Sequence, residues 1–305
     1  MSAVPILPPA LAAGDRVAVL APGFPARSPK DLAAGTRVLE RYGLRPREGT
    51  AVRRRHGYLA GTDADRARDL QKAIDDPAVK AIFFARGGWG TSRLLDRLDL
   101  APLRRRPKLL VGYSDLTTLF ARIQRFFPLV TAHGPMVAEL SHPAAWHEPS
   151  FRRALFHPER PLVLRTPARA ALARGRAEGR LLGGCLSLLA HLCGTGIFPE
   201  TAGAVVFMED IGEEPFRVDR MLWQLRASGF FHRVAAVLVG RMVACRPRLG
   251  MRSFTVREVL ADHLGGLGVP VILDLPAGHG PRKRTLPLGL TARVDTAAGR
   301  VTIGP

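Results

Sequence analysis

The chain has 305 residues, of which 47% are hydrophobic and 23% charged, so it is long enough to bury one large core or two ordinary ones. No apolar run approaches the roughly 18 to 20 residues that span a bilayer, and residues 1–14 lack a basic region and a small-residue cleavage site, so we expect a cytoplasmic protein without membrane contact. The formal net charge of +19 comes mainly from arginines scattered along the chain without interleaved aromatic residues, which argues against a nucleic-acid surface.

The first part of the chain alternates strand and helix patterns. In chain order we expect a strand at 16–21, a helix at 28–42 capped by Ser28, a helix at 62–74 capped by Thr62, a strand at 79–85, a helix at 91–98, a strand at 108–112, a helix at 115–124 and a strand at 129–132. This alternation predicts a parallel sheet with helices on both faces. We therefore expect an α/β protein whose N-terminal parallel-sheet domain, of flavodoxin- or amidotransferase-like type, covers residues 1–157.

Residues 158–174 are rich in proline, arginine and alanine and are weakly periodic, so we expect a linker there. Beyond it the patterns predict a helix at 184–193, a strand at 204–208, a helix at 215–227, a strand at 234–239, a helix at 254–264, a strand at 269–273 and a terminal hairpin at 290–294 and 300–303. The expected second unit is a C-terminal mixed α/β domain over residues 175–305.

Ser114 follows an apolar strand directly, and a helical pattern begins just after it. A serine at such a sharp turn stands clear of the backbone, which is the geometry of a nucleophile elbow. A serine in this place is also a common helix N-cap. The glycine that usually follows a hydrolase elbow serine by two positions is replaced by Leu116, so the local sequence leaves both interpretations open.

Two later residues have settings that favour chemistry. Glu209 follows the apolar strand at 204–208, and catalytic groups gather at the carboxyl ends of parallel strands. His279 lies between Gly278 and Gly280 after the strand at 269–273, and imidazole is the base best matched to neutral pH. The alternatives are an acidic loop that caps the helix at 215–227 and a loop histidine without a role.

The loop Arg86-Gly87-Gly88-Trp89-Gly90 stands between a strand and a helix, where its amide groups can face an anion. It does not match the dinucleotide-binding glycine pattern, and the chain has no phosphate-binding loop, so we expect no nucleotide cofactor. An oxyanion hole that faces Ser114 is the better interpretation. Three widely spaced cysteines and the absence of paired zinc ligands predict neither a disulfide framework nor a metal site.

Several blocks together resemble the LD-carboxypeptidases, the serine peptidases also called muramoyltetrapeptide carboxypeptidases. The blocks are RGGWGTSRLLD at 86–96, PKLLVGYSDLT at 107–117, HGPM at 133–136, LGGCLS at 182–187, EDIGEEPFRVDRML at 209–222, GHG at 278–280 and LPLG at 286–289. They run in order through both halves of the chain. Cys185 departs from the pattern, because the family more often has asparagine there, and this puts a hydrogen bond at the start of the following helix in doubt.

The resemblance implies a Ser-Glu-His charge relay. Ser114 is expected to be the nucleophile, His279 the general base and Glu209 the carboxylate that orients the histidine, with the acid and base donated by the second domain. Backbone N–H groups of Asp115 and Gly88 are the expected oxyanion donors.

The implied substrate is a cytoplasmic murein tetrapeptide, and the bond cut joins diaminopimelate to a terminal D-alanine. Arg86 and Trp89 are expected to contact this substrate. The resemblance further implies a homodimer that needs no cofactor or metal.

Three other functions stay open. A relative of the microcin C immunity peptidases would use the same three residues on an aminoacyl nucleotide. A basic protein that binds nucleic acid without catalysis would keep steep salt-dependent DNA binding after Ser114→Ala. A class I amidotransferase-like domain would need cysteine where Ser114 stands.

Overall fold

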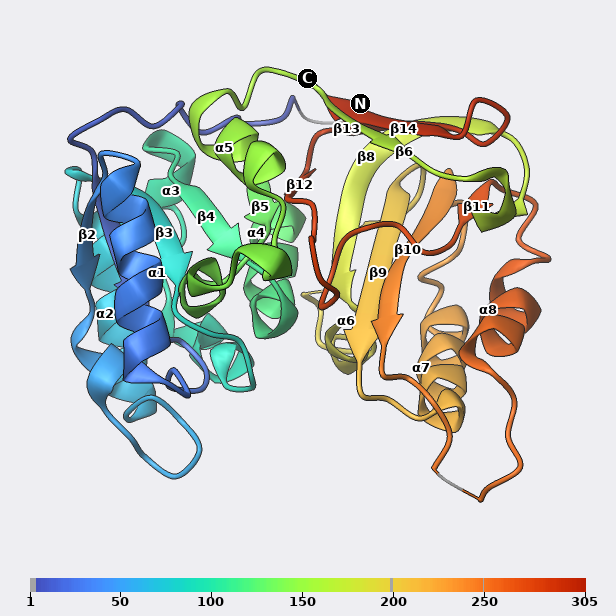
Figure 1. Cartoon of the computed structure of the whole chain (residues 1–305), viewed down its shortest axis with the longest axis horizontal. Helices are drawn as coiled ribbons and strands as arrows, with labels where there is room; N and C mark the ends of the chain where they lie inside the picture. Colours follow the sequence, from blue (N-terminus) through green and yellow to red (C-terminus); the bar gives the residue numbers. More distant parts are fainter. Residues whose placement is uncertain (1–3, 198–199, 249) are drawn as a thin grey trace.

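The computed structural model describes residues 4–197, 200–248 and 250–305. Two sheets stand side by side, each with helices packed against it, and the strand β12 (Leu286–Leu288) lies between them (Figure 1). Within the described residues no helix is long and apolar enough to cross a bilayer.

The first sheet has six strands in the order β12-β5-β4-β3-β1-β2. Its elements before residue 157 are β1 (Arg16–Leu20), α1 (Pro29–Arg41), β2 (Arg45–Glu48), α2 (Asp63–Asp75), β3 (Val79–Phe84), α3 (Pro102–Arg105), β4 (Leu109–Gly112), α4 (Thr117–Phe126), β5 (Thr131–His133) and α5 (Glu148–Phe156). Strands β1 to β5 are mutually parallel, which confirms the expected α/β class. The expected helix at 91–98 is a 3₁₀ helix, η2 (Thr91–Arg97).

The second sheet has eight strands in the order β6-β14-β13-β8-β9-β10-β11-β7. Its elements are β6 (Leu162–Arg165), β7 (Ala171–Ala173), β8 (Arg176–Cys185), α6 (Leu186–His191), β9 (Val205–Ile211), α7 (Pro215–Ala227), β10 (Ala236–Val243), α8 (Val256–Leu264), β11 (Val271–Ile272), β13 (Thr291–Asp295) and β14 (Arg300–Gly304). Strands β8 to β11 are parallel and the outer strands antiparallel, so the sheet is mixed. The expected hairpin is confirmed as β13 and β14.

The segment between the halves belongs to the second sheet, and a later strand links the halves. The segment 158–174, expected to be a linker, carries β6 and β7, and these strands pair with β14 and β11 of the second sheet. After β11 the chain returns to the first sheet and adds β12 antiparallel to β5, with Leu286 opposite His133. One continuous cluster of buried apolar side chains contains members from both sheets.

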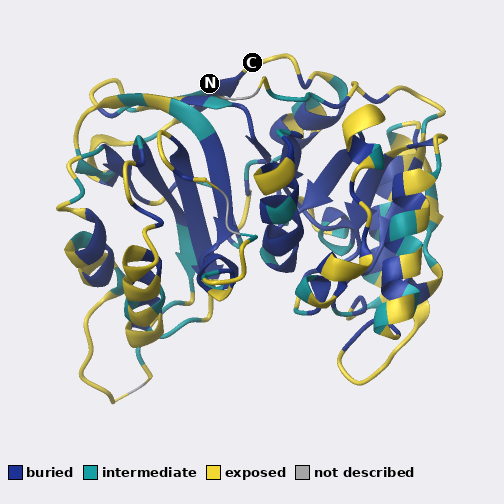
Figure 2. Ribbon diagram, turned by 180° about the vertical axis from the view of Figure 1, so that it is seen from behind, coloured by how far each residue is buried: buried dark blue, intermediate teal, exposed yellow. Residues whose placement is uncertain are grey.

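Local capping explains where the early helices begin. Ser28 Oγ accepts a hydrogen bond from the N–H of Asp31 at 3.1 Å, and Thr62 forms a reciprocal capping box with Asp65. The strands of both sheets are largely buried, while the outer faces of the helices are exposed (Figure 2). The buried strands and the helices packed on them form a rigid base, and the carboxyl ends of the parallel strands can carry a site.

Candidate active site

Ser114 occupies a sharp turn between β4 and α4. Its backbone φ is +58°, a left-handed conformation that residues with a side chain rarely adopt. The 3₁₀ turn η3 (Ser114–Leu116) precedes α4, and no side-chain cap bond is formed at the start of either element. The serine therefore does not cap the helix, and its backbone conformation is that of a nucleophile elbow.

The glycine loop is fixed against this turn. Asp115 Oδ2 accepts hydrogen bonds from the N–H and the hydroxyl of Thr91 at 3.0 and 2.7 Å. The backbone of Gly87 passes so close that a Cβ built there would lie 3.2 Å from the Oγ of Ser114, and Gly88 has a φ of +116° that favours glycine. The loop can thus bring main-chain N–H groups to the serine, as an oxyanion hole requires.

The sequence pattern predicted Glu209 just after the end of its strand, but the residue lies inside β9. The strand continues to Ile211 because β10 accompanies it past a register shift between Val239 and Met242. The Glu209 side chain is fully buried. Its partner, His279, comes from the loop after β11.

A hydroxyl, an imidazole and a carboxylate form a continuous chain of hydrogen bonds. His279 Nδ1 lies 2.8 Å from Glu209 Oε2, and His279 Nε2 lies 3.2 Å from Ser114 Oγ. The N–H of His279 donates to the same carboxylate oxygen at 2.9 Å. A Cβ at Gly278, whose φ is +98°, would collide with this carboxylate, so the glycine permits the close approach.

The charges around Glu209 and His279 suit base catalysis by the imidazole. Burial alone would raise the pKa of Glu209, but the imidazoles of His133 and His279 outweigh burial and lower that pKa to about 2. Burial alone would lower the pKa of His279, but the Glu209 carboxylate outweighs it, so the pKa of His279 lies above its ordinary value. The carboxylate is therefore ionised at neutral pH, where it holds Nδ1–H and leaves Nε2 to accept the Ser114 proton.

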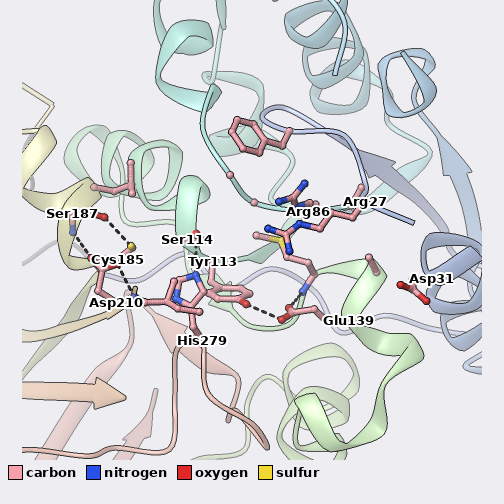
Figure 3. Close-up of a pocket in the computed structure, with 18 of the residues that line it drawn as sticks. Arg27, Asp31, Arg86, Tyr113, Ser114, Glu139, Cys185, Ser187, Asp210 and His279 are labelled. Carbon is pink, nitrogen blue, oxygen red and sulfur yellow. Dashed lines mark hydrogen bonds between the residues drawn. The ribbon is translucent and has the colours of Figure 1, made fainter. Parts of the chain in front are cut away.

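Ser114 and His279 open onto a cleft of about 690 Å³ that both halves of the chain line. Arg27 and Arg86 lie together on one side of it, and Asp210 lies on the other (Figure 3). Glu213 also lines the cleft. Both cleft arginines thus come from the first half, which also contributes Asp31 and Glu139 to the lining.

Comparison with known proteins places the chain. The model of the LD-carboxypeptidase N-terminal domain matches residues 17–134, and the model of the C-terminal domain matches residues 178–294. The chain belongs to the LD-carboxypeptidase family.

Relatives in this family match along nearly the whole chain. The chain is 43% identical to a putative carboxypeptidase of Streptomyces coelicolor, covering 98% of this chain and 96% of the relative. It is 34% identical to the murein tetrapeptide carboxypeptidase of Pseudomonas aeruginosa, covering 92% and 93%. A solved muramoyltetrapeptide carboxypeptidase from Oxalobacter formigenes superposes with a TM-score of 0.83 at 31% identity, covering 95% of this chain and 99% of that one.

The microcin C7 self-immunity protein MccF, solved with aspartyl sulfamoyl adenosine, is also similar. It superposes with a TM-score of 0.90 at 25% identity and covers 99% of both chains. The LD-carboxypeptidase fold seen here is thus shared by two named branches.

The residues expected to contact substrate in this LD-carboxypeptidase are placed differently from one another. Arg86 lines the cleft, its guanidinium lies 5.3 Å from the ring centroid of Phe24, and one N–H donates to the Pro25 carbonyl at 3.3 Å. Trp89 does not line the cleft, and its ring instead packs edge-on against His191 at 4.8 Å. The tryptophan therefore contacts the second half of the chain next to the site.

The departure at Cys185 has a local consequence. Helix α6 begins after Cys185 without a side-chain cap bond from that residue. The carboxylate of Asp210 instead accepts a hydrogen bond from the N–H of Ser187 at 2.7 Å. The helix start is thus satisfied from β9, and the hydroxyl–imidazole–carboxylate chain is unaffected.

Sequence reasoning missed a buried polar cluster beside His279. The Tyr113 ring meets the His279 ring edge-on at 4.8 Å, and its hydroxyl donates to Glu139 Oε1 at 2.8 Å. Lys283 Nζ donates to the Tyr113 hydroxyl at 3.2 Å and forms an ion pair with Glu139. The sequence signal that could have pointed to this cluster was the position of Lys283, four residues after His279.

Proposed function

We propose that this protein is a serine-type LD-carboxypeptidase that hydrolyses the bond between diaminopimelate and the terminal D-alanine of murein tetrapeptides in peptidoglycan recycling. One observation carries the proposal. His279 lies within hydrogen-bonding distance of both Ser114 and Glu209 beside a cleft, although the three residues are far apart in the sequence. The murein carboxypeptidases among the relatives support the choice of substrate.

In the proposed reaction His279 Nε2 removes the hydroxyl proton of Ser114, and Oγ attacks the last peptide carbonyl. The oxyanion rests on the N–H groups of Asp115 and Gly88, each contributing about 3 kcal/mol to lowering the barrier. The C–N bond then breaks, and His279 gives its proton to the departing amine. Water repeats the sequence on the acyl-enzyme, which releases the shortened peptide and restores Ser114.

The terminal carboxylate of the substrate needs a cation, and the two cleft arginines are suited to it. Burial and the neighbouring charge of Arg27 lower the pKa of Arg86, so an anion between the two guanidinium groups relieves an existing repulsion. We assign the carboxylate to Arg27 and Arg86. Trp89 has the lesser part of supporting the loop against His191.

A cytoplasmic location and a homodimer are further parts of the proposal. They follow from the family resemblance.

The first prediction concerns the three residues of the hydrogen-bonded chain. Ser114→Ala and His279→Ala should each lower kcat by about 10⁴-fold or more, and Glu209→Ala by somewhat less, because the carboxylate acts only through the imidazole. Release of D-alanine from purified murein tetrapeptide is measured by mass spectrometry, with an aminoacyl-sulfamoyl nucleotide as the competing substrate. His157→Ala, at an exposed site outside the cleft, is the control. Turnover like that of the unaltered protein in any of the three variants removes that residue from the mechanism, and cleavage of the nucleotide alone reassigns the substrate.

A further inference from the structure

One oxygen of the buried Glu209 carboxylate has no hydrogen-bond donor among the residues that the structure describes. Oε2 accepts two hydrogen bonds from His279, as described above. Oε1 is buried and accepts none from any residue that the structure describes. An unsatisfied buried acceptor is costly, and a charged one more so, which makes a missing donor next to Oε1 unusual in a native protein.

His133 lies beside Oε1, the carboxylate oxygen that His279 does not contact. It is the last residue of β5, and its side chain is 2% exposed. Its Nε2 is 3.7 Å from Oε1 of Glu209 and, like Oε1, has no hydrogen-bond partner among the described residues. Two buried groups that need a partner therefore face each other across slightly more than hydrogen-bond distance.

Aromatic neighbours set the orientation of the His133 ring. Its centroid lies 5.5 Å from that of Tyr113 and 5.1 Å from that of Phe207. The Tyr113 hydroxyl donates to Glu139 and accepts from Lys283, and it makes no hydrogen bond with His133 among the contacts of the described residues. Pairing of β5 with β12 fixes the backbone that carries the ring.

We propose that His133 is a positioning residue whose Nε2–H donates to Oε1 of Glu209 and so holds the carboxylate in place for His279. The proposal rests on the roles assigned above to Ser114, Glu209 and His279. Shortening the separation to about 2.9 Å completes the bond. A carboxylate whose two oxygens are each held by a hydrogen bond resists rotation, so Oε2 stays in line with Nδ1 of His279.

The charge balance predicts the sign of the effect of removing His133. Without this donor the negative charge of Glu209 is less stabilised. It is then stabilised best by the positive charge of a protonated His279. The pKa of His279 should therefore rise further, and activity, which needs neutral His279, should begin at higher pH. The other titratable groups around the pair are Tyr113, Cys185, Asp210 and Lys283, and none of them is altered in the test.

The test uses His133→Phe, which keeps an aromatic ring among aromatic neighbours, and His133→Gln, whose amide can donate to Oε1. The readout is the rate at which a fluorophosphonate labels Ser114 as a function of pH. In that step the Ser114 Oγ–P bond forms, the P–F bond breaks, the proton passes to His279 and fluoride leaves. The probe reports nucleophile activation whatever the natural substrate is, so a wrong peptide assignment would not obscure the result.

We expect His133→Phe to slow labelling by about 10- to 100-fold, the size of effect that a small misplacement of a catalytic group produces. The acid limb of the pH–rate profile, where the labelling rate rises with pH, should move to higher pH. His133→Gln should restore most of the rate and return this limb toward its original pH. His232→Phe, an exposed loop site, is the matched control. An unchanged limb in His133→Phe, a limb moved to lower pH, or no recovery with glutamine overturns the proposal.

A second measurement does not depend on the variants being well folded. In the unaltered protein labelled with ¹⁵N-histidine, the proton of His133 should reside on Nε2 and give a hydrogen-bonded resonance. A neutral His133 with its proton on Nδ1 cannot donate to Glu209 and overturns the proposal even if Ser114 is never labelled.

Discussion

The backbone of Ser114 is held in a strained conformation that presents its side chain at the turn. A serine at φ +58° sits in a region that costs an L-residue about 1–2 kcal/mol. Leu116 replaces the glycine of the usual elbow, yet the turn still forms, because Asp115 and Thr91 bind the elbow to the glycine loop. Neighbouring contacts therefore enforce the conformation of the turn.

This strain gives a prediction about two inactive variants. Ser114→Gly should be about 0.5–1 kcal/mol more stable than Ser114→Ala, because glycine accepts the left-handed conformation and only part of the gain is lost to its freer unfolded chain. Both variants lack the hydroxyl, so the lost contact with His279 cancels in the comparison. Chemical denaturation monitored by circular dichroism measures the difference. Equal stabilities, or a more stable alanine variant, would show that the turn is unstrained.

At the scale of elements, the segment that carries His279 is fixed to the first half of the chain at several points. Its loop is closed by a hydrogen bond from the N–H of Arg284 to the Pro276 carbonyl at 2.7 Å. The Lys283 carbonyl accepts from the N–H of His147 at 3.0 Å, and its ammonium group lies between Tyr113 and Glu139. The base from one half is thus positioned by contacts with the other half.

We therefore expect Lys283→Met to lower both stability and kcat. It leaves the Glu139 carboxylate, 27% exposed, without its ion-pair partner, at a cost of about 3 kcal/mol, the lower end of the range for a broken buried pair. The double variant Lys283→Met/Glu139→Gln should recover much of the stability, because it leaves no unpaired charge, but it should not recover kcat fully. Thermal melts and D-alanine release measure the two effects. A single variant as stable and active as the unaltered protein would mean that the cluster does not fix the histidine.

The same segment marks the limit of prediction from sequence. Helices α1 and α2 could be placed because their caps, Ser28 and Thr62, are local signals. The chemistry of Ser114 and His279 was visible because each stands next to a strand end or between glycines. The strand β12 was not predicted as a strand, since three residues containing a proline form one only when β5 supplies the other edge.

Positions that depend on such long-range pairing were also unpredictable. Glu209 was expected after its strand, but β10 extends the pairing and places it inside. His133 and Lys283 acquire their partners only when the second half returns to the first sheet. No local pattern encodes that return, because the contacts join residues more than 70 positions apart.

At the scale of the whole molecule, one cluster of buried apolar side chains spans the two halves, beside a second cluster confined to the first half and a third confined to the second. The cluster of buried apolar residues runs from Leu110 of β4 to Phe207 of β9, and Leu286 of β12 belongs to it. A chain of this size often divides into parts that unfold separately. Here the shared cluster opposes such a division, and so does β12, a strand from the second half that completes the first sheet. Neither half can keep all its contacts once the other unfolds.

We therefore predict one cooperative unfolding transition, with calorimetric and van't Hoff enthalpies that agree. Leu286→Ala, at a fully buried site in β12, should destabilise the protein by about 3 kcal/mol and shift the whole transition to lower temperature without splitting it. Val163→Ala, at an exposed position of β6, should leave the transition almost unchanged. Scanning calorimetry is combined with fluorescence of the buried Trp146, which reports on the first half once Trp89 and Trp223 are replaced by phenylalanine. Two resolved transitions, or a Trp146 signal that melts apart from the heat signal, would mean that the halves fold independently and that His279 is brought to Ser114 only by docking.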